Sequence, residues 1–335
     1  MKLQASLGSA SLQAVSAIAQ AAEALGLDML WTNETQHDPF LPHVPAAQHT
    51  QRLRLGTAVA IAFARSPTVI AQTAWDLAAV SHGRFVLGLG TQVKAHVERR
   101  FGMPWSAPVP RLREFIQAVR ALWHTWQTGE RLNFRGAHYQ LTLMTPFFSP
   151  PPLDVPPPPI YIAGVGAPLC RLAGELADGF LLHPFHSRLY LDTVTVPAIR
   201  AGLAQAGREA GAVDLVATTF FVPPGDPAAE AQVRAQIAFY ASTPSYRGVL
   251  AAHGWEGAGE ELSALAARGQ WGRMPALVTD EMLGVFALSG AWEQLPDLLR
   301  ARYGSLVEHV GLYMPFEPGA QDETWRRLAQ ALAEV

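Results

Sequence analysis

Eight short segments with the composition of buried strands recur along the chain, each separated from the next by a connection long enough to hold a helix. They are residues 3–8, 28–32, 54–61, 85–89, 160–163, 179–183, 213–222 and 308–314. Connections of that length permit parallel crossovers, and repeated right-handed β–α units close into a cylinder. The sequence therefore predicts an α/β fold, a (β/α)8 TIM barrel. A doubly wound open sheet with a helical second domain is the alternative. The return of a strand close to the C-terminus favours the barrel.

Helical patterns fill most of the connections. They cover residues 12–25, 66–80, 112–126, 167–177, 189–207 and 323–335. Two segments depart from this alternation. Residues 130–159 begin with a hairpin pattern and then hold eight prolines from Pro146 to Pro159, a density that no central strand or helix tolerates. Residues 227–304 are mostly helical. We expect a single domain over residues 1–335, with 130–159 and 227–304 as insertions.

Composition excludes several classes of protein. The 25 basic and 28 acidic residues nearly cancel, so a nucleic-acid partner is not expected. Cys170 is the only cysteine, which excludes an internal disulfide and a thiolate zinc cluster. Residues 3–22 carry no charge, but serines and glutamines interrupt them, so neither a bilayer span nor a signal peptide is expected. The default expectation is a soluble cytoplasmic protein with no membrane partner.

In a barrel of this kind, chemistry is expected where the strands end. Glycine-rich turns follow the strands at 85–89 and 160–163: Gly90 and Thr91 after the first, and Gly164, Val165 and Gly166 after the second. Backbone N–H groups of such a turn can approach an anion, and the helix that follows adds a partial positive charge. Neither turn completes a dinucleotide fingerprint, and tight barrel turns need glycine anyway. Phosphate binding and simple chain reversal both stay open, with the second turn favoured.

Acid–base candidates follow the strand at 28–32. Glu34, His37 and Asp38 lie within five residues of one another, and a histidine oriented by a carboxylate can exchange a proton near neutral pH. A surface histidine in a loop is the alternative. Lys94 lies beyond the strand at 85–89, where we interpret it as a charge partner for an anionic ligand or as a surface residue.

His183 and His186 follow the strand at 179–183 and could in principle share a metal ion. Pro184 stands between them, and no third ligand appears in a recognisable motif, so no metal site is expected. The nucleophile elbow, the P-loop and the zinc-protease motif HExxH are absent from the sequence.

Taken together, the strand-end segments resemble the luciferase-like monooxygenase superfamily, and within it the oxidoreductases that depend on coenzyme F-420 (F420), a deazaflavin. The segments that carry the resemblance are 27–42, 55–71, 81–102, 160–179 and 183–186. The resemblance implies a TIM barrel with inserted segments near its mouth. A flavin or deazaflavin ring would lie across the strand ends, and a homodimer is typical.

The resemblance also implies roles for particular residues. Thr57, Ala58 and Val59 would line the ring, with a cis peptide between Ala58 and Val59. The ring or its ribityl chain would be flanked by Gly90, Thr91 and Gln92, and the phosphate would be bound by Gly164, Val165 and Gly166. Lys94, Ala163, His183 and His186 complete the expected cofactor-binding set. Two departures leave the proton donor open: Glu34 is followed by Thr35 rather than by histidine, and Gln92 stands where relatives often have an acidic residue. His37 is the expected donor, with Glu34 and Asp38 beside it.

Three functions remain as hypotheses. The first is an F420-dependent oxidoreductase that transfers a hydride between the deazaflavin C5 and a small organic substrate. The second is a monooxygenase that uses reduced FMN and oxygen. The third is a non-catalytic barrel that only binds flavin.

Overall fold

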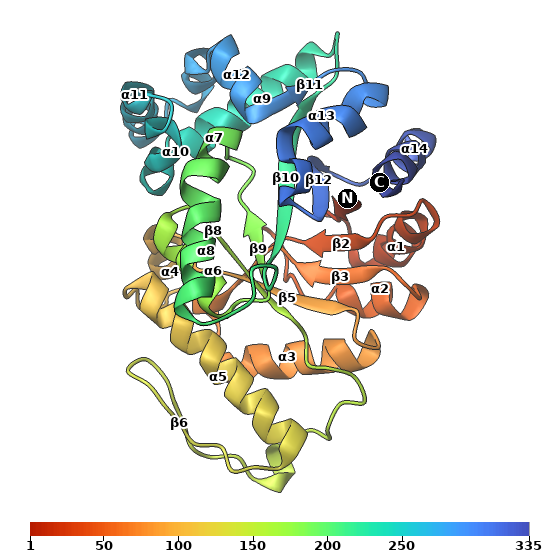
Figure 1. Cartoon of the computed structure of the whole chain (residues 1–335), viewed down its shortest axis with the longest axis vertical. Coiled ribbons are helices and arrows are strands. Elements are labelled where there is room, and N and C mark those ends of the chain that lie inside the picture. Colours follow the sequence, from red (N-terminus) through yellow and green to blue (C-terminus); the bar gives the residue numbers. More distant parts are fainter. Residues whose placement is uncertain (335) are drawn as a thin grey trace.

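The computed structural model describes residues 1–334, and its centre is a closed barrel of parallel strands (Figure 1). The barrel strands are β1 (Lys2–Ser6), β2 (Met29–Thr32), β3 (Arg54–Thr57), β5 (Phe85–Gly90), β8 (Ile160–Gly164), β9 (Gly179–Leu182), β10 (Asp214–Val222) and β12 (His309–Pro315). Each strand pairs in parallel with the next in this order, and β12 pairs with β1, so the ring is complete. The predicted TIM barrel is confirmed, and the open sheet is excluded.

The one strand predicted over residues 54–61 is two short strands, so that prediction is wrong at its middle. β3 ends at Thr57, and β4 (Ala60–Ile61) pairs with β5 instead. The Thr57 hydroxyl donates to the Gly88 carbonyl at 2.7 Å and accepts from the Gly88 N–H at 3.0 Å. Because this side chain takes over the pairing with β5, the backbone at Ala58 and Val59 is released from β5, while the Ala58 N–H still donates to the Thr32 carbonyl of β2 at 2.7 Å. A Cβ on Gly88 would lie 1.7 Å from the Thr57 carbonyl oxygen, so only glycine fits there.

Helices surround the barrel as the alternation predicts. The longer ones are α1 (Val15–Ala24), α3 (Pro67–Val80), α5 (Pro108–Thr128), α6 (Ala167–Leu176), α8 (Val196–Gln205), α13 (Leu295–Tyr303) and α14 (Asp322–Ala333). Shorter ones are α2 (His43–His49), α4 (Lys94–Arg99) and α7 (Arg188–Tyr190). Ser66 begins α3 as expected, because its hydroxyl accepts from the Val69 N–H at 3.2 Å. The sequence pattern missed α2 and α4, which are too short to show a helical period.

The two inserted segments lie at opposite ends of the molecule (Figure 1). One carries the hairpin of β6 (Phe134–Arg135) and β7 (Gln140–Leu141), followed by the proline-rich segment, in which only Pro146–Phe148 form a helical turn. The other holds α9 (Pro227–Ala241), α10 (Arg247–Ala251), α11 (Glu256–Ala267) and α12 (Asp280–Phe286). These helices share a second apolar core, separate from the barrel core, with residues such as Phe185 after β9 and Phe220 of β10. They follow the C-terminal end of β10, so they stand over that rim of the barrel.

The segment after α12 returns to the barrel. β11 (Ala287–Ser289), which the sequence pattern did not predict, pairs in parallel with β10. Leu295, Leu299 and Tyr303 of α13 then pack into the barrel core. Among residues 1–334 no helix combines the length and the apolar character that crossing a bilayer requires.

Charged side chains gather at the opposite rim, where the strands begin. Asp28 accepts a hydrogen bond from the buried His309 at 2.9 Å and lies 3.3 Å from the Lys2 ammonium and 3.9 Å from the Arg54 guanidinium. Burial alone would raise the pKa of Asp28, but the hydrogen bond and the positive charges outweigh it and hold the pKa below its ordinary value. The ionised carboxylate therefore stabilises the folded chain.

We predict that Asp28→Asn lowers the free energy of unfolding by about 1–3 kcal/mol at pH 7. The carboxylate's contribution is present above its ordinary pKa of 3.8 and is lost as the pH falls through the lower folded value. The difference between wild type and variant should therefore shrink below about pH 4. Urea unfolding at several pH values measures this difference in the free energy of unfolding. Asp154→Asn is the control, since Asp154 is exposed and its side chain forms no hydrogen bond or ion pair within residues 1–334. A difference independent of pH would contradict the prediction.

Candidate active site

A cavity of about 340 Å3 opens at the C-terminal ends of the barrel strands. Its lining comes from six barrel strands or the residues just after them, from the β3–β4 connection, and from α9. The lining residues are Gln4, Ala5, Ser6, Gly8, Trp31, Asn33, Ala58, Val59, Ala163, Leu181, Leu182, His183, Pro184, Val216, Thr218, Gln232, Gly311, Leu312, Tyr313, Met314 and Pro315. Not one of them is Asp, Glu, Lys or Arg. The cavity therefore offers apolar surface and neutral hydrogen-bonding groups only.

The floor of the cavity is a buried pair inside the barrel. The Trp31 indole N–H donates to the Gln4 amide oxygen, and the Gln4 amide nitrogen donates to the Ala217 carbonyl at 2.9 Å. Gly56 makes room for the indole, because a Cβ there would lie 2.4 Å from the ring. With its polar atoms satisfied, the pair presents a rigid and largely apolar floor.

One wall is the segment that β3 releases. Ala58 and Val59, joined by a cis peptide bond, line the cavity, as the family resemblance implies. Thr57 does not line it, because its side chain is fully buried against Gly88. Gly90 supports the wall from behind, since a Cβ on it would lie 2.5 Å from the Val59 side chain.

The acid–base candidates lie to the side of the cavity and do not line it. Glu34 and Asp38 both bind the Arg65 guanidinium, at 2.7 Å and 3.1 Å. Glu34 also accepts from the Ile61 N–H at 2.7 Å, and its side chain is only 6% exposed. The two carboxylates thus fasten the loop after β2 to the segment after β4. His37 lies on the exposed outer part of the same loop.

The turn after β8 leaves backbone donors free. Within residues 1–334, the N–H groups of Val165 and Gly166 donate no hydrogen bond, and both residues are half-buried. Gly166 is the residue before α6, and the Ala167 N–H at the start of that helix is also free, whereas Pro168 has no N–H and the Leu169 N–H donates to the Gly166 carbonyl at 3.1 Å. Gly164 packs closely on Leu169, because a Cβ would lie 2.7 Å from that side chain. This arrangement suits an anion such as a phosphate.

His183 and His186 are held as neutral imidazoles. The Phe185 N–H donates to Nδ1 of His183 at 3.1 Å, so the proton of His183 is on Nε2. Nδ1 of His186 donates to the His183 carbonyl at 2.7 Å, and the Tyr303 hydroxyl lies 2.9 Å from the other ring nitrogen. Burial lowers the pKa of His183 to about 3 and that of His186 to about 4. His183 borders the cavity and a narrow crevice that also includes Gly164, Val165 and His186.

Thr91, Gln92 and Lys94 are among the expected cofactor residues that lie outside the cavity lining. Thr91 and Gln92 are half-buried after β5, and the Gln92 side chain accepts from the N–H of the next residue, Val93. Lys94 is 65% exposed and lies 3.9 Å from Glu98, one helical turn away in α4. If these residues contact a cofactor, they contact the part of the cofactor that extends beyond the cavity.

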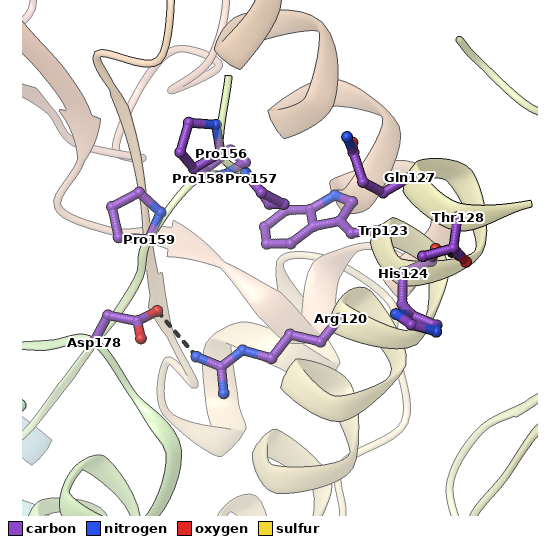
Figure 2. Close-up of a pocket in the computed structure, with 10 residues that line it drawn as sticks. All are labelled: Arg120, Trp123, His124, Gln127, Thr128, Pro156, Pro157, Pro158, Pro159 and Asp178. Carbon is purple, nitrogen blue, oxygen red and sulfur yellow. Dashed lines mark hydrogen bonds and ion pairs between the residues drawn. The ribbon is translucent and has the colours of Figure 1, made fainter. Parts of the chain in front are cut away.

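A larger hollow of about 580 Å3 lies at the other rim of the barrel. Figure 2 shows Arg120 of α5 pointing to Asp178, which it binds at 2.9 Å, with Trp123 and the prolines 156–159 beside them. The two charges neutralise each other, and the prolines precede the N-terminal end of β8. Since TIM-barrel chemistry is found at the C-terminal rim, this hollow is not the candidate active site.

The remaining reactive groups do not form a second site. Burial raises the pKa of the Cys170 thiol to about 12, so it stays protonated. Among the described residues, 1–334, no cluster of three or more His, Cys, Asp or Glu side chains could bind a metal ion.

This fold and this rim define a class of enzyme, and the comparisons with known proteins place the chain in it. Residues 1–309 match the family model of the luciferase-like monooxygenases, so the chain belongs to that family and the prediction of an enzyme is confirmed. It is therefore an oxidoreductase of the luciferase-like class.

Three similar proteins illustrate the relationship. An uncharacterized protein of Mycobacterium tuberculosis is 45% identical over 314 residues, 92% of each chain. The F420-dependent glucose-6-phosphate dehydrogenase of Nakamurella multipartita is 35% identical over 209 residues, 59% of this chain and 60% of that one. The structure of the coenzyme F420-dependent tetrahydromethanopterin reductase of Methanopyrus kandleri superposes with a TM-score of 0.78 at 20% identity, and the match covers 99% of this chain and 98% of that one.

The structure thus brings together only part of the residue set expected from the sequence. Ala58, Val59, Ala163 and His183 line the cavity. Sequence reasoning missed Gln4, Trp31 and Gln232. An amide inside an otherwise apolar strand was a signal for Gln4, whereas nothing in the helical pattern of 227–304 marks Gln232 as a residue of the rim.

We predict that Glu34→Gln destabilises the fold by about 2–4 kcal/mol, because it removes a buried charge that binds Arg65 and leaves that guanidinium poorly compensated. Thermal and urea unfolding measure the change. Glu98→Gln is the matched control, since Glu98 is exposed and only near Lys94; it should change stability by less than about 0.5 kcal/mol. Equal effects of the two substitutions would show that the Glu34 contacts do not stabilise the loop.

Proposed function

We propose that the protein is an F420-dependent oxidoreductase that transfers a hydride between the deazaflavin C5 and a small organic substrate. One observation carries the proposal: the uncharged cavity lies beside the turn at residues 164–166, whose backbone N–H groups are free, and His183 borders both. A planar ring and a phosphate need these two environments side by side. The F420 dependence named for the Nakamurella relative, 35% identical over 209 residues, supports the choice of cofactor.

The residues present fit such a group. Ala58, Val59 and Ala163 would contact the ring, and the free N–H groups of Val165 and Gly166 would bind the phosphate without a cationic side chain. Gly90 and Thr57 would hold the wall behind the ring. Lys94 would attract the anionic tail outside the cavity. When bound, the cofactor supplies the hydride chemistry, and the protein supplies orientation and electrostatics.

The chain's own groups would handle the proton that accompanies the hydride. His183 presents Nε2–H at the cavity and stays neutral at physiological pH, so it would orient and polarise a substrate oxygen as a hydrogen-bond donor. Tyr313 also lines the cavity, and burial raises the pKa of its hydroxyl, so it too stays protonated. His37 remains the proposed exchanger of protons with solvent, with Glu34 and Asp38 positioning its loop.

A monooxygenase that uses reduced FMN and oxygen is the second candidate, favoured by the family to which the chain belongs. A barrel that binds flavin without turnover is the third. Cofactor binding and turnover separate all three.

We predict that F420 binds with micromolar or tighter affinity and that FMN binds at least about 10-fold more weakly, measured by fluorescence titration. Removing the phosphate-bearing tail from the deazaflavin should weaken binding by about 100-fold, because the free N–H groups then have no anion. Gly166→Ala should weaken binding of whole F420 but not of the tail-less compound. The protein itself has room for this methyl group, whose nearest atom outside the adjacent residues is 3.6 Å away. Tight FMN binding with oxygen consumption and no F420 binding would contradict the proposal.

We predict that His183→Gln lowers kcat more than about 10-fold while F420 binding changes little, because a neutral donor to the substrate oxygen is lost. The wild-type kcat should show no ionisation of His183 between pH 5 and 9, since its pKa of about 3 lies below that range. His37→Ala provides the comparison: if His37 exchanges the proton, kcat falls. A kcat equal to that of the wild type would remove His37 from the mechanism.

A further inference from the structure

We propose that the substrate is an uncharged molecule with an apolar body and one oxygen function, a ketone or the corresponding secondary alcohol. This inference rests on the proposed function, because it concerns the space beside the ring in the same cavity. The cavity of about 340 Å3 must accept both the ring and the reacting part of the substrate, so that part is small.

The first support is the placement of charge around the cavity. Its lining holds no Asp, Glu, Lys or Arg side chain. Two arginines outside the lining are already engaged: Arg65 binds Glu34 and Asp38, and Arg302 donates to the carbonyls of Phe286 and Ala287. A carboxylate, phosphate or ammonium on the substrate would lose its hydration without gaining a partner of opposite charge.

The second support is an aromatic wall that the helical insertion completes. The His183 ring lies 4.5 Å, between centroids, from each of Tyr240 and Tyr246. The Tyr240 hydroxyl bonds to that of Tyr313, whose ring packs at 5.0 Å on Phe220. These contacts fix the two lining members, His183 and Tyr313, by packing that involves no charged group. Such a wall favours an apolar substrate body and excludes a hydrated ion.

The third support is the kind of hydrogen bond that the lining can make. The Nε2–H of His183 is bound to no acceptor within residues 1–334, and its tautomer is set by the Phe185 N–H. Asn33, Gln232 and Tyr313 add neutral donors at the rim. A carbonyl or hydroxyl oxygen can satisfy one or two of these groups, which is enough to orient a small molecule toward the ring.

The test compares three cyclohexanones of similar size on the enzyme loaded with reduced F420: 4-methylcyclohexanone, 4-oxocyclohexanecarboxylate and 4-aminocyclohexanone. Binding to the loaded enzyme and kcat/KM for oxidation of the cofactor are measured for each. We expect the neutral ketone to exceed both charged analogues by at least about 100-fold in kcat/KM. Equal or better use of a charged analogue, or binding of none of the three, overturns the inference.

A designed variant sharpens the test. Gln232→Arg places a cation at the rim and should raise kcat/KM for the carboxylate at least about 10-fold relative to kcat/KM for 4-methylcyclohexanone. Ala235→Arg on the same helix is the matched control, because Ala235 is exposed and does not line the cavity. This substitution should leave kcat/KM unchanged for both 4-methylcyclohexanone and the carboxylate. An increase in both variants would mean that general attraction, not the lining, sets the preference, and would overturn the inference. Failure of F420 to bind at all would instead refute the proposed function.

Discussion

The double hydrogen bond between the Thr57 side chain and the Gly88 backbone is the interaction on which the site depends. The Thr57 hydroxyl pairs with both the N–H and the carbonyl of Gly88 in β5, at the point where the third barrel strand stops. The chain can therefore turn away from β5 while these buried backbone groups remain paired. The released residues, Ala58 and Val59, become a wall of the cavity. Glycine at position 88 is a requirement of the same interaction, because any side chain there would collide with the Thr57 carbonyl.

The ion pairs of the barrel lie outside the lining of the candidate active site. At the rim where strands begin, Asp28, Arg54 and His309 form a charged network, and Tyr161 donates to Asp214. At the rim where strands end, the cavity lining is neutral. The ion pairs thus stabilise the barrel without placing a charge against the cavity. In the function that we propose, hydrogen-bond geometry, more than net charge, would orient the cofactor ring and a neutral substrate there.

Much of the architecture could be predicted from the sequence, because each barrel strand is a short apolar run and each outer helix has a period or a cap. The exceptions have physical reasons. Residues 54–61 form a nearly continuous apolar run, and only the tertiary contact of Thr57 with Gly88 divides them into two strands. β11 has three residues, and it exists because β10 offers it a partner. Such pairings depend on neighbours far away in the chain, which local propensity does not record.

Individual site residues were harder to predict than strand ends, because a loop's position does not fix the direction of its side chains. Glu34 and His37 are three residues apart in one loop, yet Glu34 is buried against Arg65 and His37 faces solvent.

The glycine-rich turn at 164–166 was ambiguous for a different reason: a simple reversal and a phosphate site can share one sequence. The free N–H groups of Val165 and Gly166 support the phosphate interpretation, which stays a prediction. A turn that served only to reverse the chain would gain by pairing those donors, so their freedom favours an anion as the missing partner.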